Sequence, residues 1–151
     1  MLYEFANGQG DNVRSFNYGE HDIAKQFFSE SVVNDIKNDF LDELNNKRLT
    51  FEQFMAQGNP IDGNYLFSPD VTSAVDSFNK HKNANWVQFF IGGSSVKYTP
   101  SWDGWIDVEL MNPTSRNSLL LHIGDSYDRD NYGKIPLSTI EQTYHIKIKI
   151  Q

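Results

Sequence analysis

The spacing of apolar residues changes near residue 83, and this change constrains the fold more than any other feature of the sequence. Before it, apolar residues recur at steps of three and four, which predicts helices that bury one face. After it, apolar and polar residues alternate in short segments separated by Gly, Pro, Asp and Asn, which predicts strands. The helical stripe comprises Ile23, Phe27, Phe28, Val32, Val33, Ile36, Phe40, Leu41 and Leu44.

The predicted helices have recognisable ends. Asp22 is a suitable N-cap for the first, and Ser29 or Ser31 for a second one after a break. A further helical turn is expected over residues 50–57. The segment 68–82 begins with Ser-Pro-Asp, which places an N-cap, a proline and an acidic residue where a helix start favours them.

Five segments of the second half fit strands, namely residues 86–93, 94–100, 104–112, 117–123 and 143–150. In the last of them the apolar face carries Tyr144, Ile146, Ile148 and Ile150, and the polar face carries His145, Lys147 and Lys149. Residues 104–112 alternate in the same way, with Trp105, Asp107 and Glu109 opposite Ile106, Val108 and Leu110. The short connections favour antiparallel hairpins. We therefore expect an α+β fold, in which an acidic helical N-terminal half packs on a four- to five-stranded antiparallel sheet.

Length and composition fit one domain over residues 1–151. We expect an irregular lead-in over 1–20, a mainly helical part over 21–82 and a mainly β part over 83–151. Cysteine is absent, which excludes disulfides, thiolate nucleophiles and Cys-type zinc sites. No apolar run approaches the roughly 20 residues of a spanning helix.

The charge is negative and unevenly distributed. The net charge is −7; residues 1–82 carry 7 Lys/Arg and 13 Asp/Glu, and residues 83–151 carry 6 and 7. An acidic chain repels phosphate backbones, so there is no strong signal for nucleic-acid binding. Lys147 and Lys149 nevertheless give the last predicted strand a basic face that could track phosphate.

The C-terminal 65 residues resemble the C-terminal tip of RHS/YD-repeat secreted proteins. In that family a G–x–I–x–V strand leads into N–x–T–S–x–x–S, a variable loop follows, and the closing strand begins with QT and an aromatic residue. This chain supplies Gly104, Ile106 and Val108, then Asn112, Thr114, Ser115 and Ser118, and finally Gln142, Thr143 and Tyr144.

The resemblance implies the toxin domain of a polymorphic toxin used in interbacterial competition. Such a domain is the excised tip of a larger RHS-repeat carrier chain, is secreted into a target cell, and is neutralised by a cognate immunity protein. It supplies context rather than a mechanism. A membrane or envelope target, with action in the periplasm, is the first expectation, because many aromatic residues accompany the acidic charge and the lack of cysteine.

The expected variable loop holds the candidate catalytic residues His122, Asp125, Asp128 and Arg129. His122 ends an apolar strand, where it is either a half-buried core histidine or a general base facing the loop. Asp128 and Asp130 imitate the start of an EF-hand loop, but Tyr132 and Thr139 occupy later ligand positions, so no metal ligands are assigned and no cofactor is expected.

Residues 125–128 also resemble the Asp-x-Tyr-Asp core of colicin M-type lipid II hydrolases, but Lys134 and Ile135 stand where that family has His-Arg. Upstream, Glu20, His21 and Asp22 form either an acid/base cluster or a helix cap. Two other functions stay open beside an envelope toxin. One is an intracellular toxic enzyme, such as a nuclease or transferase; the other is a non-catalytic binding module.

Overall fold

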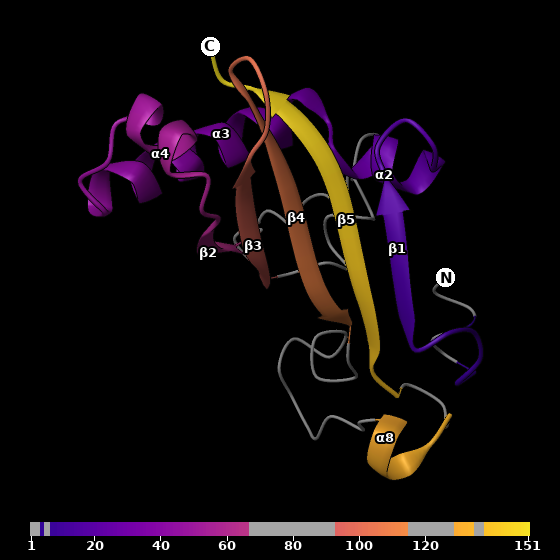
Figure 1. Ribbon diagram of the computed structural model, residues 1–151. Helices are drawn as coiled ribbons and strands as arrows, with labels where there is room; N and C mark the ends of the chain where they lie inside the picture. Colours follow the sequence, from indigo (N-terminus) through magenta and orange to yellow (C-terminus); the bar gives the residue numbers. More distant parts are fainter. Residues whose placement is uncertain (1–3, 5–6, 67–92, 115–128, 135–137) are drawn as a thin grey trace, which may run out of the picture.

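The computed structural model describes residue 4 and residues 7–66, 93–114, 129–134 and 138–151 (Figure 1). The predicted helix over 68–82, the strand over 117–123 and nearly all of the strand over 86–93 lie outside these residues. The α+β prediction is confirmed. The described helices are α2 (Asp22–Phe27), α3 (Glu30–Asn46), α4 (Phe51–Gln57) and α8 (Arg129–Tyr132). The strands are β1 (Val13–Asn17), β2 (Ile61–Leu66), β3 (Gly93–Pro100), β4 (Trp105–Thr114) and β5 (Ile140–Lys149).

The five strands form one sheet in the order β1-β5-β4-β3-β2. The pairs β2–β3, β3–β4 and β4–β5 are antiparallel, as expected from the short connections. The outer strand β1 is parallel to β5, so the sheet is mixed rather than wholly antiparallel. A parallel pair needs a long connection between its strands, and here almost the whole chain lies between β1 and β5.

Two strands occur where none was expected. β1 lies in the predicted irregular lead-in, and β2 lies in the part predicted to be mainly helical. β1 is an edge strand whose alternate residues are exposed, and β2 contains Asp62, Gly63 and Asn64, which strands disfavour. Pairing with a neighbouring strand outweighs these weak local preferences.

The helices begin and end where the local chemistry favours it. Ser29 is the N-cap residue of α3, one of the two starts expected from the sequence. Thr50 and Gln53 form a reciprocal capping box at the start of α4, and Gly58 ends that helix in the left-handed conformation at φ 68°. No helix in the described part of the chain has the length and apolarity that a membrane span requires.

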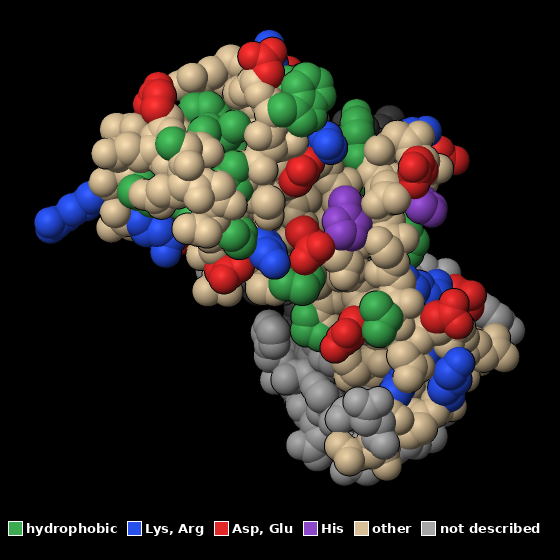
Figure 2. All heavy atoms as spheres, viewed as in Figure 1, with side chains coloured by type: hydrophobic (Ala, Val, Ile, Leu, Met, Phe, Trp, Pro, Cys, Tyr) green, Lys and Arg blue, Asp and Glu red, His purple; other side chains and the backbone are tan. Residues whose placement is uncertain are grey.

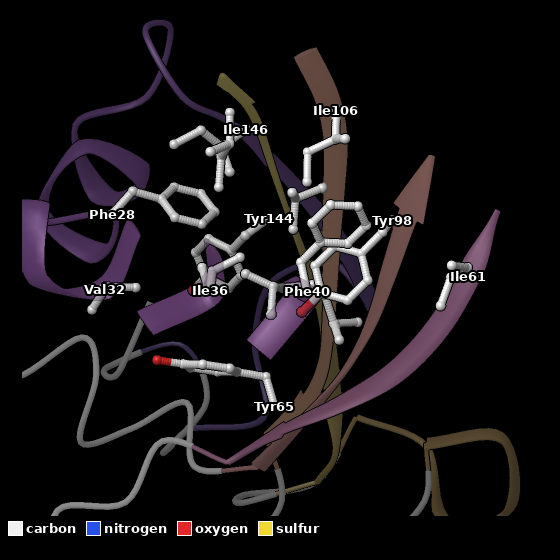
Figure 3. Close-up of a cluster of buried hydrophobic side chains, with 14 of the residues drawn as sticks. Phe28, Val32, Ile36, Phe40, Ile61, Tyr65, Tyr98, Ile106, Tyr144 and Ile146 are labelled. Carbon is white, nitrogen blue, oxygen red and sulfur yellow. The ribbon is translucent and has the colours of Figure 1, made fainter. Parts of the chain in front are cut away.

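The hydrophobic core lies between the helices and one face of the sheet (Figure 3). α3 turns Val32, Ile36, Phe40 and Leu44 inward, one per turn. The ring of Phe40 lies 5.0 Å from that of Tyr98 on β3 and 5.2 Å from that of Phe54 on α4. The sheet contributes the apolar faces of β4 and β5, as the alternation predicted. The opposite face of the sheet is left for polar side chains, and we call it the open face.

Candidate functional site on the open face of the sheet

The register of the sheet brings polar residues of separate strands into one row on the open face. His145 of β5 pairs with Glu109 of β4, and Glu109 pairs with Lys97 of β3. Residues that pair across antiparallel strands lie on the same face with their Cβ atoms about 5 Å apart. An imidazole, a carboxylate and an ammonium group therefore lie side by side over the three central strands.

Two ion pairs cross β4 and β5. His145 Nδ1 lies 3.6 Å from Glu109 Oε2, and Lys147 Nζ lies 3.4 Å from Asp107 Oδ1. All four side chains are at least 36% exposed, so each pair contributes little to stability, about 0–1 kcal/mol. Lys97 forms no ion pair within the described parts of the chain. Asp62 of β2 is the cross-strand neighbour of Lys97 on the same face, but the two form no ion pair, so the Lys97 ammonium can bind an incoming anion.

These residues line a hollow of about 730 Å³. Among the described residues, its wall contains Asn17, Tyr18, Lys97, Thr99, Trp105, Asp107, Val108, Glu109, His145, Ile146 and Lys147. In Figure 2 a histidine lies near the centre of the molecule with acidic and basic side chains beside it. The volume falls within the range of about 300–1,000 Å³ that is typical of small-molecule sites.

An aromatic pair adjoins the hollow at the turn between β3 and β4. Trp105 lines the hollow, and its ring stacks on that of Trp102 with centroids 6.2 Å apart and planes at 30°. Trp102 is 63% exposed, which is unusual for so large an apolar side chain. The turn is fixed by hydrogen bonds from Ser101 N to Trp105 O and from Trp105 N to Trp102 O. The two indole rings therefore lie at the protein surface rather than in the core.

The chemistry of the row is that of proton transfer and anion binding. A histidine changes its protonation near neutral pH, and a carboxylate beside it can orient the imidazole or take a proton itself. The distance of 3.6 Å exceeds a hydrogen bond, as is common where catalytic contacts tighten only with substrate bound. Among the described residues, no group of three or more His, Asp or Glu side chains gathers as a metal site.

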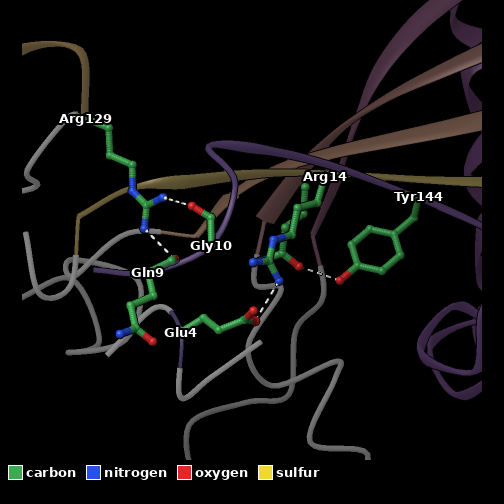
Figure 4. Close-up of polar contacts among 7 residues, drawn as sticks. Glu4, Gln9, Gly10, Arg14, Arg129 and Tyr144 are labelled. Atoms are coloured by element: carbon green, nitrogen blue, oxygen red, sulfur yellow. Dashed lines mark hydrogen bonds and ion pairs between the residues drawn. The ribbon is translucent and has the colours of Figure 1, made fainter. Parts of the chain in front are cut away.

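Of the four predicted catalytic residues, only Arg129 lies within the described chain; His122, Asp125 and Asp128 lie outside it, as does the colicin M-like core 125–128. In the EF-hand-like segment 128–139, Arg129–Tyr132 form the helix α8. Arg129 is 6% exposed, and within the described parts of the chain its guanidinium donates hydrogen bonds to neutral oxygens only (Figure 4). Nε donates to Ser138 Oγ at 2.8 Å, Nη1 to Gly10 O at 3.1 Å and Asn12 Oδ1 at 3.2 Å, and Nη2 to Gln9 O at 3.2 Å. Burial, and secondly the charge of Arg14, lower its pKa. These contacts bind the N-terminal loop to the segment before β5.

A second polar row lies on the core face of the sheet, beyond its apolar part. Arg14 of β1, Gln142 of β5 and Asn112 of β4 pair in register. Arg14 Nη1 donates to Glu4 Oε2 at 2.9 Å, and the Tyr144 hydroxyl bonds to Gln142 Oε1 (Figure 4). Asn112, Gln142 and Tyr144 are positions of the RHS-like motif, so three of its residues meet here although Asn112 lies 30 positions before Gln142 in the sequence.

The cluster Glu20-His21-Asp22 forms a turn rather than a reactive group. His21 Nδ1 accepts the backbone N–H of Asn17 at 3.1 Å, and the Asn17 side chain donates to Glu20 at 2.7 Å. His21 is also the N-cap residue of α2, although its side chain makes no capping bond. The cap interpretation therefore describes this segment better than the acid/base one, with His21 in the place expected for Asp22.

Sequence reasoning did not select His145, Glu109 or Lys97 as site residues. The alternation placed His145 and Glu109 on the polar faces of their strands, whereas it assigned no face to Lys97. What was missing was the register that sets Glu109 against His145.

No protein family, curated protein or solved structure matches this chain.

Proposed function

We propose that this chain is a toxic effector domain that cleaves a phosphate-linked substrate by acid–base chemistry on the open face of its sheet. The effector role is supported by the resemblance to RHS/YD-repeat tips, whose motif positions Asn112, Gln142 and Tyr144 lie together in the fold. On this proposal the domain is carried by a longer RHS-repeat chain, secreted into a target cell and neutralised by a cognate immunity protein.

The observation that carries the chemistry is the His145–Glu109 pair inside a hollow that also holds lysines. A proton acceptor and a proton donor lie 3.6 Å apart, with Lys97 and Lys147 in the same wall. Cleavage of a phosphate ester needs a base for the nucleophile, an acid for the leaving group and positive charge beside the phosphoryl oxygens. The hollow contains one group for each task.

We infer an intracellular target rather than the envelope that composition suggested. That expectation rested on the many aromatic residues together with the acidic charge and the lack of cysteine. Eight of the 21 aromatic residues are buried in the core: Phe27, Phe28, Phe40, Phe51, Phe54, Tyr65, Tyr98 and Tyr144. Rings that pack against one another do not contact a membrane. These eight residues therefore lend no support to a membrane interface.

The test is expression in a bacterial host, once in the cytosol and once with an export signal, followed by counting of viable cells. We expect death when the chain stays in the cytosol, and loss of toxicity in His145→Ala and Glu109→Gln. Glu141→Gln is the matched control, because Glu141 is exposed on β5 on the same face but outside the hollow. Urea unfolding of each purified variant checks that it is folded.

Three outcomes would overturn the proposal. Death only on export would place the target at the envelope. Equal toxicity of all variants would remove the open face from the mechanism. Harmlessness in both compartments would favour a non-catalytic binding module.

A further inference from the structure

The aromatic pair, Trp102 and Trp105, adjoins the His145–Glu109 pair. The proposed function assigns a role to His145 and Glu109 but none to the two tryptophans. Trp105 belongs to the wall that also carries Glu109 and His145, and Trp102 extends the aromatic surface outward from that wall. Indole rings exposed beside cationic side chains are the combination on which single-stranded nucleic acids are held, bases on the rings and phosphates on the cations.

We propose that the hollow binds single-stranded RNA and cleaves it by transesterification. This inference rests on the proposed function, whose substrate class it names. Trp105, with Trp102 stacked on it, holds a nucleobase. Lys97 and Lys147 face the scissile phosphate, and Glu109 and His145 move the protons.

The side chains in the hollow suffice for every step of the reaction. Glu109 takes the proton of the ribose 2′-hydroxyl while that oxygen bonds to phosphorus. The bond from phosphorus to the 5′-oxygen breaks, and the protonated imidazole of His145 gives its proton to that oxygen. The products are a 2′,3′-cyclic phosphate and a 5′-hydroxyl end. Glu109 and His145, 3.6 Å apart, then exchange the proton and return to their starting states.

The choice of RNA follows from the nucleophile. RNA carries its own hydroxyl beside each phosphate, so the protein needs only proton transfer and charge, without a site that activates water. Positioning a nucleophile within the substrate also lowers the entropic cost of the attack. DNA lacks this hydroxyl, and a lipid-linked pyrophosphate would need an external nucleophile.

Part of the negative charge lies away from the hollow. The carboxylates of α3 belong to the layer on the other side of the sheet, whereas Asp62 of β2 pairs with Lys97 at the edge of the hollow. Within the hollow, Asp107 and Glu109 face Lys97, Lys147 and His145. When His145 is protonated, the wall carries three cationic and two anionic groups, a balance that accepts one phosphate.

The test uses the purified chain with a short labelled single-stranded RNA, the same sequence as DNA, and an RNA methylated at every 2′-oxygen. We expect cleavage of the unmodified RNA only, with cyclic phosphate ends in the product. His145→Ala and Glu109→Gln should each lower the rate about a hundredfold or more, the usual size of general acid–base effects. Lys97→Ala should slow cleavage as well, whereas Lys134→Ala, an exposed lysine outside the hollow, should leave it unchanged.

The aromatic pair is tested by binding to the methylated RNA, which cannot react. Trp105→Ala should weaken binding about tenfold, since stacking of one base contributes about 1–3 kcal/mol. Trp102→Ala should weaken it less. Because Trp102 is exposed, its replacement leaves the hydrophobic core unchanged, so this variant should fold normally.

The outcomes separate the two proposals. Cleavage of DNA at a similar rate, or RNA cleavage unaffected by His145→Ala and Glu109→Gln, overturns the RNA mechanism. Absence of RNA cleavage with cytosolic toxicity that still depends on His145 overturns the substrate class but leaves the proposed function in place. Toxicity independent of His145 overturns both.

Discussion

Arg129 illustrates how a residue type that is typical of active sites can be used by the fold. Its guanidinium makes four hydrogen bonds to neutral oxygens and is nearly inaccessible to solvent. A buried cation is costly unless its donors are satisfied, and here backbone and side-chain oxygens of the N-terminal loop and Ser138 satisfy them. We infer that Arg129 holds the loop rather than reacting with substrate.

Replacement of Arg129 should therefore lower the stability of the fold rather than remove a group that reacts with substrate. We expect Arg129→Ala to lower the free energy of unfolding by about 2–4 kcal/mol, because several buried acceptors lose their donor together. Arg129→Lys should recover only part of it, since an ammonium cannot reproduce the planar fork. Urea unfolding measures both. A variant as stable as the wild type but without toxicity would instead support the catalytic role expected from the sequence.

Tyr98 carries a polar contact into the core. Its ring is fully buried, and its hydroxyl donates to Asp39 Oδ2 on α3. Tyr98→Phe keeps the ring and removes the bond, so we expect a loss of about 1–2 kcal/mol in unfolding free energy. Tyr18→Phe is the control because Tyr18 is 51% exposed. Equal stability of the two variants would show that the contact contributes nothing.

The buried tyrosines also predict a decline of stability in alkali. Burial, and then the charges of Asp35 and Asp39, raise the pKa of Tyr65 from 10.0 to about 12. Burial raises the pKa values of Tyr98 and Tyr144 as well. Because the pKa of each tyrosine is higher in the folded state than in the unfolded state, its contribution to the free energy of unfolding is complete below pH 10. This contribution is lost as the pH rises through the pKa of the folded state.

We therefore expect the urea midpoint to fall between pH 10 and 12, and to fall less steeply in Tyr65→Phe. Identical slopes in the two proteins would contradict the assignment to Tyr65.

At the scale of elements, two glycines with positive φ allow the cost of backbone strain to be measured separately from the cost of a steric clash with an added Cβ. Gly104, in the turn between β3 and β4, has φ +79°, and a Cβ there would lie 2.8 Å from the carbonyl oxygen of Gln151. Gly133, after α8, has φ +72° with nothing within 4 Å of such a Cβ. Both alanine variants bear the cost of a left-handed backbone, of order 1 kcal/mol, and only Gly104→Ala adds a steric clash with the backbone.

We expect Gly104→Ala to be the less stable of the two in thermal unfolding, with the aromatic pair of the same turn disturbed. Near-ultraviolet circular dichroism reports on Trp102 and Trp105 directly. Equal melting temperatures for the two variants would mean that the C-terminus moves away without cost.

The elements that could be predicted are those whose own sequence determines them. α3, α4, β4 and β5 have strong periodicity, caps or clean alternation, and each was expected close to its observed place. β1 and β2 were not, because their strand character comes from pairing with β5 and β3 rather than from their residues. The parallel pairing of β1 with β5 likewise has no local signal, since the two strands lie at opposite ends of the sequence.

At the scale of the whole molecule, the candidate site is a product of register. The polar faces of β4 and β5 were readable from alternation, but a one-residue slip would have set Glu109 against a different neighbour and turned it to the core. His145, Glu109 and Lys97 come from three strands, and only the assembled sheet joins them. Composition counts 21 aromatic residues, but it cannot show that eight of them are buried in the core.

The most direct test of the account is a double-mutant cycle on His145 and Glu109, read as the rate at which viable cells are lost after cytosolic expression. If the two residues act as one acid–base unit, Glu109→Gln in the His145→Ala background should add almost nothing to the loss of activity. The Glu141→Gln substitution, added to His145→Ala in the same way, provides the baseline. Losses that multiply independently, or single variants as toxic as the wild type, would contradict the claim that the open face of the sheet is the site of function.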